Sequence, residues 1–176
     1  METAVLIKTE RLRIRRVRAE DWQSIKAIWE SFNLSIYAQY DMPHNTDAAD
    51  VRARIARWAN AGSGIEHMFF AVCLGETVIG YIALNQRENG HEIGYCFHID
   101  YHGKGYAKES HAALFTYLSG QGITRLTAGT ALLNLPSVNL LKKLGFKQIG
   151  TEKVSFYHDD KGKEIVFDGG IFELIL

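Results

Sequence analysis

Residues 92–118 constrain the fold more than any other part of the chain, because a strand pattern, a glycine turn and a helical pattern follow one another directly. Gly103 and Gly105 stand in the turn, where glycine tolerates backbone angles that other residues avoid and leaves its N–H open to an anion. The helical pattern starts at Tyr106, and a helix N-terminus also favours negative charge. The pattern predicts a phosphate-binding turn. An ordinary strand-to-helix turn remains the alternative for a lone Gly-x-Gly.

The other apolar patterns describe one mixed α and β domain. Apolar runs at 68–74 and 78–84, joined by Gly75-Glu76, predict a hairpin that the run at 91–100 extends. A strand at 123–130 after the helix completes a strand, crossover helix and strand unit, which adds a parallel pair. Further helices are expected at 22–32, 46–61 and 137–144, and further strands at 6–9, 12–17, 146–156, 165–167 and 171–176. Gly62 and Gly64 are expected to end the second helix.

These elements predict an α+β fold. We expect a central mixed, mostly antiparallel twisted sheet of about six to seven strands, flanked by about four helices. At 176 residues and 47% apolar content, the chain can bury one core, so a single domain over residues 1–176 is expected.

The composition argues against several classes of partner. Lys plus Arg and Asp plus Glu both number 20, so no global field attracts nucleic acid or an anionic membrane. The apolar run at the start is too short for a signal peptide, and no stretch approaches the roughly 20 apolar residues of a membrane span. We expect a cytoplasmic protein without nucleic-acid or membrane partners. Monomer and homodimer both stay open.

The two cysteines lie in apolar runs. Cys73 and Cys96 show neither Cys-x-x-Cys nor Cys/His spacing, so we expect free buried thiols and no metal site.

A second motif follows one strand after the helix. It reads Asn134-Leu-Pro-Ser137, then a short helical run ending in Gly145-Phe146. Strand, Gly-x-Gly-Tyr-Ala turn, helix, strand and this motif, in this order, resemble the GCN5-related N-acetyltransferases (GNAT family) over nearly the whole chain. The opening Thr-Glu-Arg-Leu-Arg-Ile-Arg of residues 9–15 and the Glu-Ile-Gly-Tyr of residues 92–95 are most similar to the RimJ/RimL-like ribosomal-protein alanine acetyltransferase branch. The resemblance implies the GNAT fold and transfer of acetyl from acetyl-CoA to a primary amine.

The resemblance also implies where acetyl-CoA binds. The residues implied are Phe97, His98, Ile99, His102, Gly103, Lys104, Gly105, Tyr106, Ala107 and Asn134. The turn would hold the pyrophosphate, the strand end would align the pantetheine arm through main-chain bonds, and Asn134 would bond to that arm or near it. His102 departs from the Gln or Arg of the family pattern. We expect little effect, because backbone N–H groups do most of the binding.

Attack by an amine requires the neutral form. At pH 7 deprotonation costs roughly 4–5 kcal/mol for a lysine amine of pKa ~10.4 and about 1–1.4 kcal/mol for an α-amine of pKa ~7.7–8.0. Glu92 is the candidate general base, acting directly or through water, since it starts the strand expected to pass the thioester. Its place ahead of the turn resembles that of the family's glutamate. A solvated strand-end glutamate is the alternative.

The other catalytic roles are less well marked in the sequence. Many relatives carry a tyrosine acid where this chain has Leu141, so Ser137 is the nearest substitute as proton donor. Ser137 equally suits a helix N-cap. A main-chain N–H near His98 or Ile99 is expected to bind the oxyanion. We expect direct attack, without an acetyl-cysteine intermediate.

The acceptor is the least defined part of the prediction. Tyr37, Tyr40 and Asp41 lie in the link between the first two helices, where the family commonly forms the acceptor wall, and are candidate amine contacts. The tryptophans on helical stripes are expected in the core. The acceptor is a protein N-terminal α-amine or a small-molecule amine such as an aminoglycoside, polyamine or amino acid. A catalytically silent CoA-binding module is the alternative to an enzyme.

Overall fold

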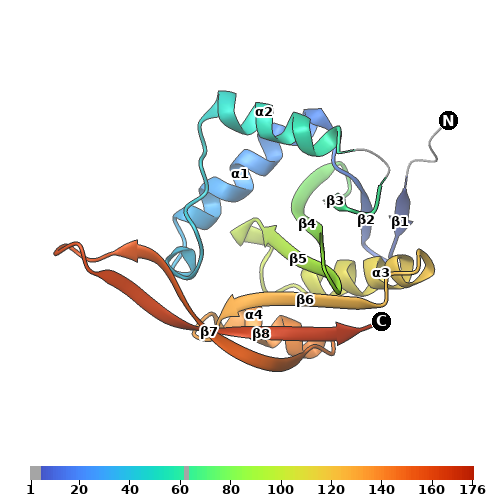
Figure 1. Cartoon of the computed structure of the whole chain (residues 1–176). Coiled ribbons are helices and arrows are strands. Elements are labelled where there is room, and N and C mark those ends of the chain that lie inside the picture. The colour runs from blue at the N-terminus through green and yellow to red at the C-terminus, as the bar shows by residue number, and fades with distance from the viewer. Residues whose placement is uncertain (1–4, 62–63) are drawn as a thin grey trace.

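The fold is built on one sheet with helices on both faces (Figure 1). A computed structural model describes residues 5–61 and 64–176. In these ranges the strands are β1 Leu6–Lys8, β2 Leu12–Arg16, β3 His67–Leu74, β4 Thr77–Arg87, β5 Gly90–Phe97, β6 Arg125–Ala131, β7 Lys147–His158 and β8 Glu164–Ile175. The helices are α1 Trp22–Asn33, α2 Ala48–Ala59, α3 Tyr106–Gly120 and α4 Leu135–Lys143, with short 3-10 turns η1 Ala19–Asp21, η2 Ala38–Tyr40 and η3 Ile99–Tyr101. The predicted class is confirmed, with eight strands in the described part rather than six to seven.

The sheet order is β1-β2-β3-β4-β5-β6-β8-β7, and only β5 and β6 run parallel among the described strands. Helix α3 makes the crossover that a parallel pair requires, as predicted. The parallel pairing covers only His91 with Leu126 and Glu92 with Thr127. Beyond Glu92 the two strands separate toward their carboxyl ends (Figure 1). Among the described strands, none therefore pairs with the second half of β5 on this side.

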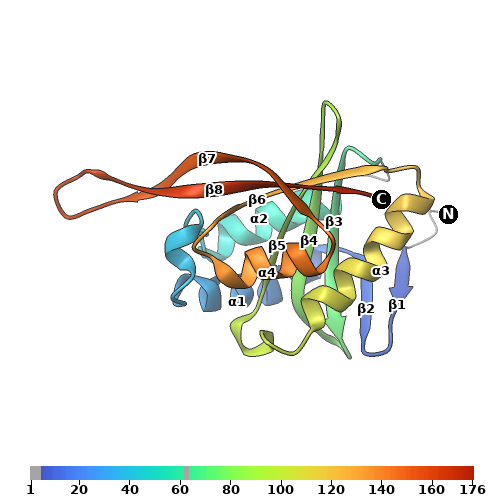
Figure 2. The ribbon, with the colours of Figure 1, turned by 90° about the horizontal axis from the view of Figure 1, so that it is seen from below.

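Two apolar cores fill the two faces of the sheet. One lies under α3 and α4 and includes Phe97, Leu141 and Phe172. The other lies under α1 and α2 and includes Trp29 and Cys96. Successive strand residues point to opposite faces, which places neighbouring residues 96 and 97 in different cores. Figure 2 shows α3 and α4 side by side on one face, with α1 and α2 on the other.

Several predicted boundaries move by a few residues. Helix α2 begins after Asp47, whose carboxylate accepts from the N–H groups of Ala49 and Asp50. It ends at Ala59, so Gly64 lies beyond the helix, and the predicted stop at Gly62 is outside the described residues. The two predicted C-terminal strands are one continuous strand, β8, which pairs with β7 in a long hairpin (Figure 1).

The cysteines are free and buried, as predicted. Burial raises the pKa of Cys96 to about 12, which keeps its thiol protonated at neutral pH. None of the helices in residues 5–61 and 64–176 is both long enough and apolar enough to span a membrane.

Candidate active site

The glycine turn has the backbone geometry that the sequence predicts. Gly103 and Gly105 have φ angles of 72° and 81°, in the left-handed region. A Cβ on Gly103 would meet no atom within 4 Å, so the turn surface is open there. Gly105 is the N-cap of α3 and no side chain caps the helix, which leaves its first N–H groups available to an anion.

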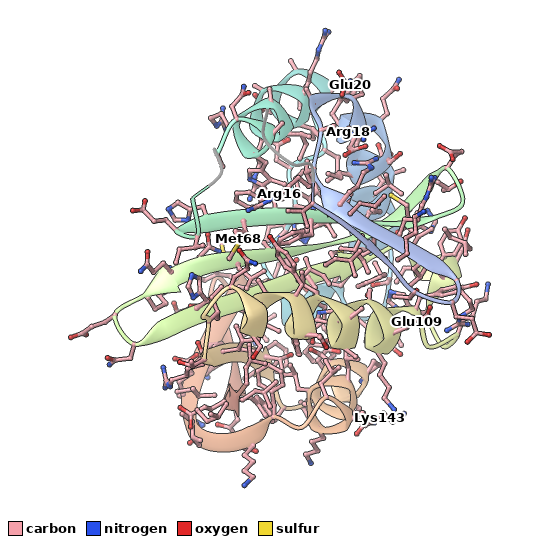
Figure 3. The ribbon with its side chains drawn as sticks, turned by 90° about the vertical axis from the view of Figure 1, so that its right-hand side faces the viewer. Arg16, Arg18, Glu20, Met68, Glu109 and Lys143 are labelled. Atoms are coloured by element: carbon pink, nitrogen blue, oxygen red, sulfur yellow. The ribbon has the colours of Figure 1, made fainter. Side chains whose placement is uncertain are left out.

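Arg11 braces this turn from the β1–β2 hairpin. Its Nη1 donates to the Lys104 carbonyl at 2.9 Å, and its guanidinium lies 4.5 Å from the centre of the Tyr106 ring. Its Nε also donates to Glu109 at 2.7 Å, and Thr9 bonds to the same carboxylate. Figure 3 shows Glu109 on α3 beside this hairpin. The hydrophobic periodicity does not predict this role for Arg11. Only the family resemblance of residues 9–15 singles out the segment that contains it.

His102 and Lys104 point back into the protein. His102 Nε2 donates to the Phe97 carbonyl at 2.9 Å and so ties the strand end to the turn. Lys104 Nζ donates to the Asp100 carbonyl at 2.9 Å and lies over the Tyr101 ring. The side chains of His102 and Lys104 are therefore engaged within the protein, and the main-chain N–H groups are what the turn offers to an anion.

The unpaired edge of β5 lies earlier in the strand than expected. His98 N–H donates to the Ile79 carbonyl at 2.9 Å, and Ile99 N–H donates to Ser31 Oγ at 3.2 Å. Both groups already have partners, which corrects their assignment as oxyanion donors. Since an antiparallel ladder alternates, Tyr95 and Phe97 direct their N–H groups away from β4, toward the side that β6 has left. The N–H groups left open to a ligand are therefore those of Tyr95 and Phe97 rather than those of His98 and Ile99, while the Phe97 carbonyl already accepts from His102.

The N-terminus of α4 lies across this opening. Asn134 is the N-cap residue, and its side chain makes no hydrogen bond to the described residues. Ser137 lies inside the helix, so its interpretation as the N-cap is wrong. Its Oγ lies 2.8 Å from the Tyr95 hydroxyl, and burial raises the Tyr95 pKa to about 12. Leu141 is fully buried in the core.

Sequence reasoning missed Tyr95, because it precedes Ser137 by 42 positions and stands in an apolar strand. Only the register of β5 and the place of α4 bring the two hydroxyls together.

Glu92 marks the point where β5 and β6 separate. Its side chain is 47% exposed and accepts from Arg87 Nε at 2.9 Å. An exposed ion pair of this kind contributes about 0–1 kcal/mol to stability, so the Glu92 carboxylate can separate from Arg87 at little cost in free energy. Glu92 pairs across the ladder with Asn85 and shares a strand face with Gly94.

A hollow of about 320 Å³ opens on the α1 and α2 face of the sheet. Its lining residues are Asp41, His44, Arg54, Trp58, Phe69, Tyr81, Ala83, Asn85, Gly94 and Tyr95. Its volume is at the lower end of the range for small-molecule sites. It reaches β5 at Gly94, where a Cβ would meet nothing within 4 Å.

The predicted acceptor residues separate in the structure. Asp41 lines the hollow, and burial raises the pKa of its carboxyl. Tyr40 packs its ring against Phe167 of β8 at 5.1 Å, and Tyr37 is not among the lining residues. Trp58, expected in the core, lines the hollow, whereas Trp29 is fully buried.

Comparison with known proteins agrees with this geometry. The family model of the acetyltransferase (GNAT) domain matches residues 11–147. The chain belongs to the GNAT acetyltransferase family. It is an acyltransferase that uses acetyl-CoA, and the open glycine turn, uncapped α3 and unpaired edge of β5 fit that coenzyme.

Similar proteins extend over most of this acetyltransferase. The uncharacterized N-acetyltransferase p20 of Bacillus licheniformis is 30% identical over 171 residues, covering 94% of this chain and 92% of p20. A GNAT acetyltransferase structure from Bacillus anthracis is 26% identical, with a TM-score of 0.73 and coverage of 97% and 98%. RimL, a ribosomal L7/L12 α-N-protein acetyltransferase solved with coenzyme A, has a TM-score of 0.84 at 18% identity and 98% coverage of both chains, which shows a shared fold.

Gly105→Val is expected to weaken coenzyme binding about tenfold or more. A β-branched residue at a φ of 81° carries roughly 1–3 kcal/mol of strain, and the added Cβ would stand 3.3 Å from Arg11 Nη2 and crowd that side chain. Isothermal titration with coenzyme A measures the change, and turnover at saturating coenzyme should fall less. Gly162→Val is the matched control, since Gly162 has a φ of 78° in the β7–β8 turn. Unchanged affinity in Gly105→Val would contradict the turn assignment.

Proposed function

We propose that this protein transfers the acetyl group of acetyl-CoA to a primary amine by direct attack of the amine on the thioester. One observation carries the proposal: the opening between β5 and β6 has the coenzyme turn and α4 on one side and the hollow on the other. Gly94 and Tyr95 of β5 line that hollow. An acceptor and the thioester can therefore meet at β5 without an acetylated enzyme group. The protonated thiol of buried Cys96 supports the same mechanism.

The coenzyme supplies the activated acetyl group. The N–H groups of residues 103–107 would hold its pyrophosphate, and the Tyr95 and Phe97 edge would hold its pantetheine arm. The unpaired amide of Asn134 is available to the same arm. The resemblance also implies His98 and Ile99, but their N–H groups already donate hydrogen bonds within the protein.

Glu92 removes the proton from the amine in this proposal. It stands at the start of the opening and on the face that carries the hollow, but it is not one of the lining residues. We therefore assign the proton transfer to a water between Glu92 and the amine.

Ser137 donates a hydrogen bond to the leaving sulfur in this proposal. Its Oγ lies 2.8 Å from the Tyr95 hydroxyl, and the raised pKa of Tyr95 keeps that phenol protonated, so it can donate to Ser137. A thiol with a pKa of ~8.5 leaves as the thiolate without a strong acid, and the sulfur then takes its proton from solvent.

A protein N-terminal α-amine is the proposed acceptor. The structural likeness to RimL supports it. An α-amine also costs less to deprotonate at pH 7 than a lysine amine, which suits a base that acts through water. The small volume of the hollow supports a second candidate, a small-molecule amine such as an aminoglycoside, polyamine or amino acid.

An amine panel tests the proposal. Short peptides with a free N-terminus, the same peptides with a blocked N-terminus and one internal lysine, and the small amines are each incubated with acetyl-CoA and the protein. Mass spectrometry is expected to show one acetyl group on an amine, with thiol release in step. Release of thiol that does not depend on any acceptor would overturn the transfer. Acetylation of the blocked peptides alone would assign a lysine acceptor.

A further inference from the structure

We propose that the acceptor amine carries a carboxylate or phosphate at its far end, which Arg54 binds, and an apolar body that lies against Trp58. This inference rests on the proposed acetyl transfer and concerns its second candidate, a small-molecule amine, whose chemical class it names. The hollow supports it through the charges, donors and rings that line it.

Arg54 brings a positive charge to the hollow. It is an exposed residue of α2, and its guanidinium lies 5.0 Å from the Trp29 ring centre and 5.4 Å from that of Trp58. No carboxylate among residues 5–61 and 64–176 forms an ion pair with it. The rings hold the planar guanidinium while its N–H groups keep their capacity to bind a carboxylate or phosphate.

Two other polar groups of the hollow lack hydrogen-bond partners within the described ranges. His44 Nε2 is buried without a hydrogen bond, and the His44 ring stacks on Trp29 at 5.3 Å. Asn85 engages its Oδ1 with His67, which leaves its amide N–H₂ without an acceptor among the described residues. Arg54 and Asn85 therefore present hydrogen-bond donors that an anionic ligand can use.

Asp41 lines the same hollow but forms no ion pair with Arg54. Its Oδ1 accepts from the N–H of Met42, and its Oδ2 lies 4.0 Å from His44 Nε2 rather than against Arg54.

The wall between Arg54 and β5 is apolar and flat. Trp58 stacks on Phe69 with ring centres 4.5 Å apart and an interplanar angle of 6°, and Tyr81 adjoins it at 5.2 Å. Ala83 and Gly94 supply the small residues of the same lining. In this proposal the apolar or aromatic body lies along this wall, between the charge at Arg54 and an amine at β5.

Matched acceptors test the inference. The first pair is para-carboxyphenethylamine and its carboxamide, and the second is tyramine phosphate and tyramine. We expect kcat/KM about tenfold or more higher for the anionic member, as a hydrogen bond to a charged group gives. The larger ratio of the two pairs identifies carboxylate or phosphate as the preferred anion.

Arg54→Gln is expected to remove this preference by lowering kcat/KM for the anionic members only. Arg52→Gln is the control, because it removes the same charge from an exposed position of α2 outside the lining. Calorimetric titration of each pair, with coenzyme A present, measures the preference without turnover. Equal affinity within both pairs, or a preference that survives in Arg54→Gln, overturns the inference even if every amine is acetylated. Charge-dependent binding without acetylation instead supports the site and overturns the proposed transfer.

Discussion

Glu92→Gln is expected to lower kcat at pH 7 by about 100-fold or more, since general bases typically contribute factors of this size. The loss should shrink as the pH rises, because the acceptor amine then loses its proton to solvent. With an α-amine acceptor the recovery should be nearly complete by about pH 9, and with a lysine acceptor it should need a higher pH. Steady-state rates from pH 6 to 10 with saturating acetyl-CoA measure the effect.

Two variants isolate the base role of Glu92. Glu88→Gln makes the same change at an exposed position of the same hairpin and should leave kcat unchanged. Arg87→Gln removes the ion-pair partner of Glu92 and should also leave kcat within a few-fold. A loss in Arg87→Gln equal to that in Glu92→Gln would assign the effect to the ion pair. An equal loss at all pH values would reject the base role.

Phe172→Ala is expected to lower the free energy of unfolding by about 3–5 kcal/mol. Phe172 is fully buried in β8, and its ring fills the space that a side chain on Gly170 would need, since a Cβ there would stand 2.5 Å from the ring. Truncation leaves a cavity in the core under α4. Because small domains have total stabilities of about 5–15 kcal/mol, the loss is large.

Urea unfolding checks this expectation through the midpoint, which should fall with little change in slope. Phe167→Ala is the matched control. Phe167 stands on the same strand, is half-buried and contacts Tyr40 at the hairpin. We therefore expect its truncation to lower the free energy of unfolding by about 1 kcal/mol. Equal losses in the two variants would contradict the place of Phe172 in the core.

Structural elements whose conformation depends on neighbouring residues can be predicted from the sequence. The hairpin around Gly75, the crossover from β5 through α3 to β6, and the left-handed angles of Gly103 and Gly105 depend on residues close together in the chain. Periodicity and turn chemistry therefore predict them. The family also follows, because two motifs in order and at the right separation carry the resemblance.

The assignments that the structure corrects depend on contacts between residues distant in sequence. Serine is a residue type favoured at helix N-caps, but α4 begins at Leu135 and the Ser137 hydroxyl contacts that of Tyr95. His98 and Ile99 lie next to the turn, but β4 and α1 take their N–H groups. In each case a residue distant in sequence provides the partner, and no local pattern carries that information.

By itself the sequence predicted the glycine turn and the family of this acetyltransferase, because glycine spacing controls the backbone of the turn and the two motifs carry the resemblance. Only the tertiary structure brought together the residues of the hollow that is the proposed acceptor site. Arg54 and Trp58 come from α2, Asp41 from the link before it and Gly94 from β5, and the hollow exists only where these elements pack together. A surface assembled from separate elements depends on packing and register, which long-range contacts set.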